Sequence, residues 1–212
     1  PRHSRKDDIV TVIKTEVELR EIYGQASGRA VDKVLTRLEK HCRRFLELSP
    51  FCLLATSGAN GDCDVTPRGD APGFVQPLDD RTIALPDRPG NNRLDSLVNI
   101  LTNPKVGTVF MIPGVNETLR INGRAEISVD PDLLARFQVQ GRPPRSVVLI
   151  HIEEAYLHCA KAFMRSRLWD PDSLNDRSVL PSMGRMLKDQ IGDNAPVEAQ
   201  EAMEQRYRKA LY

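Results

Sequence analysis

The chain has 212 residues, of which 40% are hydrophobic and 28% charged, and its formal net charge is +1. This composition is typical of a folded globular domain and excludes a disordered polypeptide. The near-zero net charge excludes the broad basic surface that binding to nucleic acid or to an anionic membrane requires.

The cysteines and the N-terminal residues carry no targeting or metal signal. Pro1 to Asp8 contain no apolar core of signal-peptide length, and no stretch approaches the roughly 20 apolar residues that span a bilayer. We therefore expect a soluble, cytoplasmic protein without a membrane partner. Cys42, Cys52, Cys63 and Cys159 are widely spaced and lack histidines at zinc-ligand intervals, so we expect neither disulfides nor a metal site.

The N-terminal region has helical signals. Thr15 and Glu18 form the pattern of a capping box. Ser27 precedes a run at helical spacing, which predicts helix over the apolar residues Val31, Val34, Leu35, Leu38, Cys42, Phe45 and Leu46. The basic residues in this run are interleaved with Glu39 and Glu47, which favours a solvated surface over a nucleic-acid face.

A β-meander is predicted to begin at Phe51. Phe51 to Ala55 is a short apolar run, and Asn60-Gly61 after it supplies the positive φ angles of a tight hairpin. The next strand, Cys63 to Thr66, runs into Pro67-Arg68-Gly69-Asp70. Thr82 to Leu85 is a further strand that ends at Pro86.

The middle of the chain alternates a short helix with strands. Leu94 to Leu101 has helical spacing and is closed by Asn103-Pro104, because proline disfavours helix in the residue before it. Val106 to Ile112 is then a strand. From Leu119 to Val129 apolar and polar residues alternate strictly, which predicts a sheet with one buried face.

A helix through Leu133 to Phe137, an apolar strand from Ser146 to Ile152 and two helices from Pro181 onward complete the predicted order. This order is that of a barrel, and the chain has no glycine-rich loop of the doubly wound nucleotide folds. We predict a mainly β fold with flanking helices. Its parts are a helical extension over residues 1–50, a barrel over 51–170 and a helical tail over 171–212.

The segment from Arg88 to Arg93 leads into a predicted helix, where unpaired N–H groups and the helix dipole favour an anion. Arg88 and Arg93 carry forked donors suited to phosphate, and Asn91 and Asn92 carry amide groups. This is a candidate phosphate cradle. On the local pattern alone, a plain helix start with two solvated arginines is an equally good interpretation.

Two further clusters are candidate ligand contacts. Thr66 to Asp70 combines a hydroxyl, a rigid proline, a guanidinium and a glycine, a set suited to the polar edge of a flat cofactor or to a β-bulge and turn. Trp169, with Arg165 among the nearby arginines, is suited to covering a ring, to anchoring an interface or to packing. The chain has no nucleophile elbow or cysteine triad pattern, so a hydrolase is not expected.

Four stretches together resemble the pyridoxamine 5'-phosphate oxidase-like superfamily of FMN-binding split β-barrels, and more closely a subgroup of FMN-dependent proteins within it. The resemblance runs from about Phe51 to Asp170. Its stretches are Thr66-Pro67-Arg68-Gly69-Asp70-Ala71-Pro72-Gly73-Phe74, Leu85-Pro86-Asp87-Arg88-Pro89-Gly90-Asn91-Asn92-Arg93, Ile112-Pro113-Gly114-Val115-Asn116-Glu117-Thr118-Leu119-Arg120 and His158-Cys159-Ala160-Lys161-Ala162.

The resemblance implies a homodimer that holds two molecules of flavin mononucleotide (FMN) at the subunit interface. It implies that a strand lines the flavin, that a loop grips the phosphate, and that other residues lie beside the ring or reach it from the second subunit. The residues for the strand are Thr66, Pro67, Arg68, Gly69 and Asp70, and those for the loop are Arg88, Asn91, Asn92 and Arg93. Leu85 and Pro86 are implied beside the ring, and Thr118, Arg165 and Trp169 from the second subunit.

The chain departs from the oxidase pattern at two places. It has Thr66 to Ala71 where the oxidase has Arg-x-Val-Leu-Leu-Lys, and it lacks the C-terminal Arg-Leu-x-Asp-Arg pattern. Oxidation of vitamin B6 is therefore not expected. The resemblance implies a flavin-dependent oxidoreductase acting on an unidentified small molecule. A non-catalytic flavin or haem carrier and a deazaflavin-dependent reductase are the alternatives that the sequence leaves open.

Overall fold

The computed structural model describes residues 12–26, 28–192 and 196–212. Predictions on Pro1 to Asp8 and on Ser27 lie outside the described residues. The chain divides into two compact units, Pro1–Val34 and Leu35–Tyr212, and each is described by itself. None of the helices in the described ranges has both the length and the apolar character needed to cross a bilayer. The predicted boundaries at residues 50 and 170 stay predictions.

The first unit contains helices α1, Glu16–Tyr23, and α2, Arg29–Asp32. The predicted capping box at the start of α1 is confirmed. The Thr15 hydroxyl accepts a 3.3 Å hydrogen bond from the Glu18 N–H, and the Glu18 carboxylate accepts a 3.0 Å bond from the Thr15 N–H. Both bonds satisfy donors that the helix itself leaves unpaired.

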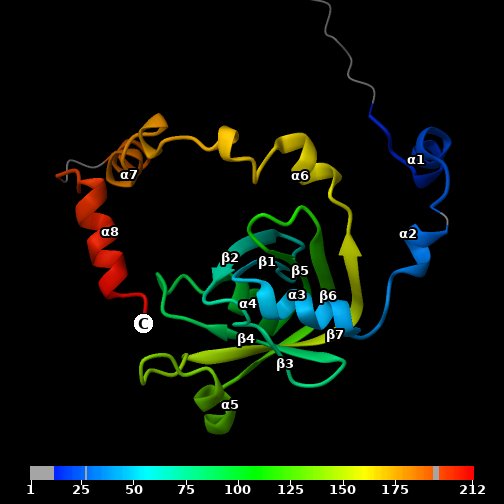
Figure 1. The fold of residues 1–212 in the computed structure, drawn as a ribbon, viewed down its shortest axis with the longest axis horizontal. Helices are drawn as coiled ribbons and strands as arrows, with labels where there is room; N and C mark the ends of the chain where they lie inside the picture. Colours follow the sequence, from blue (N-terminus) through cyan, green and yellow to red (C-terminus); the bar gives the residue numbers. More distant parts are fainter. Residues whose placement is uncertain (1–11, 27, 193–195) are drawn as a thin grey trace, which may run out of the picture. The chain divides into compact units, whose positions relative to one another are not determined.

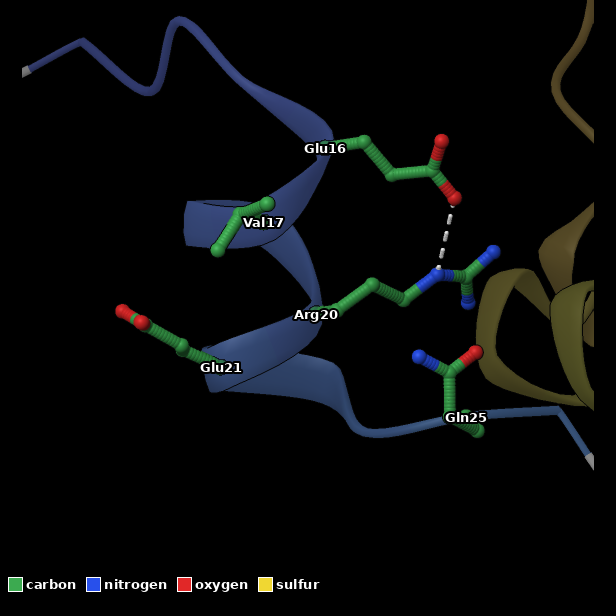
Figure 2. Close-up of a pocket in the computed structure, with 5 residues that line it drawn as sticks. All are labelled: Glu16, Val17, Arg20, Glu21 and Gln25. Atoms are coloured by element: carbon green, nitrogen blue, oxygen red, sulfur yellow. Dashed lines mark hydrogen bonds and ion pairs between the residues drawn. The ribbon is translucent and has the colours of Figure 1, made fainter.

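An open depression on α1 is lined by Glu16, Val17, Arg20, Glu21 and Gln25 (Figure 2). Arg20 Nε donates to the Glu16 carboxylate over 3.3 Å, one helical turn apart, and both side chains are exposed. Exposed pairs of this kind contribute about 0.3–0.5 kcal/mol. The depression is a solvated helix face, and it lacks the enclosed apolar walls of a ligand pocket.

The predicted helix from Val31 to Leu46 is wrong in its middle. Helix α2 ends at Asp32 and α3 spans Lys40–Leu48, while Leu35 between them forms an isolated β-bridge with Ala155. The two backbone hydrogen bonds of this bridge measure 3.1 and 2.7 Å. Pairing with a distant strand thus satisfies the backbone groups that a helix would have used. The later residues of the run do face the core, namely Leu38, Cys42, Phe45 and Leu46.

Seven strands of the second unit form one antiparallel sheet in the order β2-β1-β5-β6-β7-β4-β3 (Figure 1). The prediction of a mainly β fold with flanking helices is confirmed. The strands are β1 Phe51–Ser57, β2 Cys63–Gly69, β3 Gln76–Pro77, β4 Thr82–Asp87, β5 Lys105–Met111, β6 Thr118–Ser128 and β7 Ser146–His158.

Strand β6 has the predicted alternation. Leu119, Ile121 and Ala125 are buried. Arg124, directly before Ala125, and Glu126, directly after it, are exposed. The inward residues of β1, β4, β5, β6 and β7 form one core, which α3 and α4, Asp95–Thr102, also enter. A smaller core lies where α5, Pro131–Arg136, packs against β4 and β7.

The tail contains the two helices predicted after Pro181, α7 Met183–Ile191 and α8 Gln200–Lys209. Before them lie α6, Lys161–Ser166, and two short 3₁₀ helices, Pro171–Ser173 and Arg177–Val179.

Two strands run past the prolines that were expected to end them. Strand β2 continues through Pro67 to Gly69, and β4 continues through Pro86 to Asp87. A proline is tolerated in β2 because, among the described strands, β2 is an edge of the sheet and pairs only with β1. In the β1–β2 hairpin only Gly61, and not Asn60, takes a positive φ.

Candidate functional site

The ends of β2 and β4 meet, although the two strands stand far apart in the order of the sheet. Arg68 of β2 forms an ion pair with Asp87 of β4, and both side chains are largely buried. Asp70, directly after β2, accepts a 2.7 Å hydrogen bond from Arg88 Nε, directly after β4. We call these four residues the seam. It closes the barrel through side chains at a place where no backbone ladder joins the described strands.

The second pair of the seam is held from several sides. The Asp70 side chain is only 3% exposed, and Arg88 also donates from Nη1 to the carbonyl of Phe137 over 2.7 Å. The Tyr212 hydroxyl donates a 2.5 Å hydrogen bond to the other Asp70 oxygen. An ion pair with this many partners is ordered, unlike most exposed pairs.

The same contacts shift two pKa values. Burial by itself raises the pKa of Asp70, but hydrogen bonds from Tyr212, the Ala71 N–H and Arg88 outweigh it, so the pKa lies below its ordinary value of 3.8. The hydrogen bond to Asp70 and, after it, burial raise the pKa of Tyr212 above 10.0. Near neutral pH, Asp70 is therefore ionised and Tyr212 keeps the proton that it donates.

A lowered carboxyl pKa makes stability depend on pH. Ionised Asp70 stabilises the fold above its unfolded pKa of 3.8, and this contribution is lost as the pH falls through the lower folded value. We expect Asp70→Asn to be less stable than the wild type near neutral pH and the difference to narrow in acid. Urea unfolding across the acid range measures it, with the exposed Glu117→Gln as control. A difference that stays constant with pH would contradict this assignment.

The loop over residues 88–94 has a backbone that is unusual for its sequence. Asn92 and Leu94 take left-handed conformations, with φ of 60° and 62°. Asparagine tolerates this region, but a leucine there costs on the order of 1–2 kcal/mol. Arg145 helps to hold the loop by donating a 2.9 Å hydrogen bond to the Asn92 side chain. Strain retained in this way is frequent in ligand-binding segments.

Helix α4 begins directly after this loop without a side-chain cap at Leu94. As far as the described residues show, its first-turn N–H groups are therefore available to an anion. Arg93 is 75% exposed beside them, with Nε 2.8 Å from Asp95 of the first turn. Ser96 donates a 2.8 Å hydrogen bond to Asp64 of β2, which ties the helix start to that strand.

Strand β2 connects the helix start to the seam. Asp64, Thr66 and Arg68 alternate with exposed residues and point to the same side of β2, next to the buried residues of β1 that pair with them. One side of a single strand therefore leads from the α4 first turn, through the Thr66 hydroxyl, to the Arg68 guanidinium. Pro67 and Gly69 lie on the opposite, exposed side.

The predicted residues beside the ring are both buried. Leu85 is 2% exposed and belongs to the main core, and Pro86 pairs with Val147 of β7. Of the loop residues, the Asn91 side chain accepts a 3.1 Å hydrogen bond from the Arg93 N–H. Of the predicted site residues, Arg68, Asp70 and Arg88 are the ones that the structure brings together, in the seam.

The residues implied for the second subunit lie in another part of the chain. Thr118 is buried at the start of β6, Arg165 is exposed on α6, and Trp169 Nε1 donates a 3.0 Å hydrogen bond to the Val115 carbonyl. The Trp169 ring stacks on Phe163 at 5.7 Å. Within the described ranges, Thr118, Arg165 and Trp169 form no hydrogen bond or ion pair with the seam.

Sequence reasoning missed three residues of this region. Asp87 stands inside the quoted stretch from Leu85 to Arg93, and its position before an arginine was the available signal. Arg145 and Tyr212 join the site only through the tertiary fold, 53 residues from Asn92 and 142 residues from Asp70. No local pattern marks either of them.

The barrel is similar to several solved structures. HupZ of Group A Streptococcus is 21% identical, with a TM-score of 0.47 over 57% of this chain and 93% of that one. The conserved hypothetical protein Rv2991 of Mycobacterium tuberculosis is 18% identical, with a TM-score of 0.46 over 73% and 100%. An FMN-binding protein of Syntrophomonas wolfei is 11% identical, with a TM-score of 0.42 over 55% and 88%. No curated protein matches the chain.

The family comparison covers the barrel and the site. The model of the pyridoxamine 5'-phosphate oxidase family matches residues 38–159, which include α3, all seven strands and α4. The matched range is more than half of the chain, and it contains the seam and the loop over residues 88–94. The mainly β architecture agrees with it, and the chain belongs to the pyridoxamine 5'-phosphate oxidase family.

Proposed function

We propose that this chain binds FMN at the seam and the loop over residues 88–94, and that it is a flavin-dependent oxidoreductase acting on a small molecule. The observation that carries the proposal is the uncapped start of α4 directly after a loop with two arginines. Free N–H groups, the helix dipole and guanidinium donors together favour a phosphate group. Membership of the pyridoxamine 5'-phosphate oxidase family supports the same ligand class.

The donors present fit FMN. Arg68 Nε is buried and has no hydrogen-bond partner among the described residues. A buried donor without an acceptor costs about 1–3 kcal/mol, so it calls for an explanation. The isoalloxazine ring of FMN carries carbonyl oxygens and ring nitrogens that accept hydrogen bonds at its edge. Thr66, on the same side of β2, adds a hydroxyl that donates or accepts.

The proposed roles of the residues are binding and orientation. Bound FMN supplies hydride or electron transfer through its ring, and this chemistry belongs to the cofactor. Arg88, Arg93 and the first-turn N–H groups of α4 would hold the phosphate. Arg68 and Thr66 would orient the ring edge. The buried Leu85 and Pro86 form a rigid wall at β4. No acid or base among these residues is required for the transfer itself.

We also propose that two copies of the chain associate through the outer face of β1, β2 and β5. Outward side chains that pair across these strands are largely apolar, as in the row Pro67, Leu53 and Val109 and the row Val65, Ala55 and Gly107. Val65 is 59% exposed. Farther along the same rows, on β6 and β7, polar contacts border this face. The Arg120 guanidinium lies over the Tyr156 ring, and the Asn122 side chain donates a hydrogen bond to Glu154. An apolar centre with a polar border is typical of a protein interface.

A charge in the centre of this outer face tests the dimer. We expect Leu53→Asp to shift the protein from dimer to monomer, because a carboxylate buried in an apolar interface remains unpaired on association. Light scattering coupled to size-exclusion chromatography measures the mass. Leu19→Asp on α1, at an exposed leucine outside the proposed interface, is the control. A wild type that is monomeric with FMN bound would contradict the proposed dimer.

The visible absorbance spectrum of the purified protein, before and after loading with FMN, tests the cofactor. We expect a flavin spectrum, release of FMN on denaturation as identified by mass, and bleaching when a nicotinamide donor is added without oxygen. A colourless protein that cannot be loaded with FMN would overturn the proposal. FMN binding without reduction by any donor would leave a carrier, and a preference for deazaflavin would assign the site to that cofactor.

A further inference from the structure

The side chain of Tyr212 lies on the Asp70–Arg88 pair of the seam. Its hydroxyl donates a 2.5 Å hydrogen bond to Asp70 Oδ1, and the Arg88 guanidinium lies over its ring at 5.7 Å from the centroid. Arg142 donates to the backbone carbonyl of Tyr212, which holds this segment in place. A residue after α8 thus contacts two residues of the proposed flavin site at once.

These contacts use two of the three nitrogens of the Arg88 guanidinium and leave Nη2 for another acceptor. Its Nε is bonded to Asp70 and its Nη1 to the Phe137 carbonyl, both over 2.7 Å, while the aromatic ring lies against the guanidinium. Arg88 Nη2 donates to no acceptor in the described part of the chain, and it is not among the buried side-chain atoms that lack a partner. The guanidinium is therefore fixed, and its Nη2 is available to a ligand.

We propose that Tyr212 is a positioning residue for the phosphate of FMN: it fixes the Asp70–Arg88 pair so that Arg88 Nη2 is held ready for the anion. This inference rests on the proposed function. An arginine loses side-chain entropy when it is ordered. Where Tyr212 has already ordered Arg88, FMN binding does not incur that loss.

Riboflavin, which is FMN without the phosphate, separates this role from a general structural one. Tyr212→Ala is expected to weaken FMN binding about fivefold, because Arg88 regains rotamer freedom, and to leave riboflavin binding unchanged. Tyr212→Phe keeps the ring over Arg88 and loses the hydroxyl, so its FMN affinity is expected to fall between those of the wild type and Tyr212→Ala. Quenching of flavin fluorescence in titrations of the apoprotein measures both affinities.

Tyr207→Ala is a matched control. Tyr207 lies on α8 and also has an arginine, Arg206, over its ring at 4.8 Å, but neither residue contacts the seam in the described structure. We expect Tyr207→Ala to keep the wild-type affinity for FMN. In an Arg88→Ala background, Tyr212→Ala is expected to have no further effect on FMN affinity, because the two residues act as one unit.

Different outcomes test the positioning role and the proposed function separately. A wild type that does not bind FMN overturns both. A wild type that prefers FMN to riboflavin, with the same preference in Tyr212→Ala, overturns the positioning role alone. Equal losses of FMN and riboflavin affinity in Tyr212→Ala also overturn it, because a structural defect does not select for the phosphate.

Discussion

Replacing Arg68 with alanine is expected to lower the free energy of unfolding by about 3 kcal/mol, because it leaves Asp87 without its partner in a largely buried place. The Asp87 side chain is 12% exposed, so water only partly replaces the lost guanidinium. Urea unfolding of the apoprotein, followed by circular dichroism, measures the change without a contribution from bound cofactor.

An exposed arginine pair provides the control for this effect. Arg44 lies 2.9 Å from Glu47, but the two side chains are 65% and 58% exposed, so Arg44→Ala is expected to change stability by less than about 1 kcal/mol. Arg68→Met combined with Asp87→Leu is expected to recover part of the loss, since no charge is then left buried alone. If Arg68→Ala proves as stable as Arg44→Ala, the ion pair between Arg68 and Asp87 does not close the barrel.

Replacing Arg93 with alanine is expected to weaken FMN binding about 10- to 100-fold, the range for losing a hydrogen bond to a charged group worth about 1.5–3 kcal/mol. Arg93 is the most exposed arginine beside the uncapped start of α4, and its only ion-pair partner among the described residues is Asp95. The stability of the apoprotein is expected to stay close to that of the wild type, because this pair is solvated.

Arg185 offers a matched control for Arg93. It also donates from Nε to an aspartate on its own helix, Asp189, over 2.9 Å, and it is also exposed, but it lies on α7. We expect Arg185→Ala to bind FMN with the affinity of the wild type. Titrations with FMN at two salt concentrations measure the affinities of both variants. Equal affinities of Arg93→Ala and the wild type would show that the phosphate is held elsewhere.

The strands could be predicted where one face is buried and the other solvated. Strand β6 is the clearest case, because its apolar and polar residues alternate along almost its whole length. The ends of β2 and β4 could not be predicted, because Pro67 and Pro86 normally mark strand ends, and only their places in the sheet make them acceptable. The break at Leu35 was missed for a similar reason, since its partner Ala155 is 120 residues away.

Two local motifs of the proposed site could be read from the sequence, but their arrangement in space could not. The stretch from Thr66 to Asp70 and the stretch from Leu85 to Arg93 each carry an arginine and an aspartate. Their crosswise pairing, Arg68 with Asp87 and Asp70 with Arg88, depends on how the sheet curls. Tyr212 has no local signal at all, because its role arises from the return of the tail to the barrel.

The barrel is closed at the seam by side chains, and this affects where its strands separate most easily. Between paired strands, separation breaks a row of backbone hydrogen bonds, each of which depends on its neighbours. Along the seam, separation breaks two ion pairs and the contacts of Tyr212, and it leaves every strand ladder intact. We therefore expect the described strands of the barrel to separate more easily along the seam than between strands that are paired by backbone hydrogen bonds. We expect a ligand bound at the seam to respond to, and to restrain, the separation of β2 from β4.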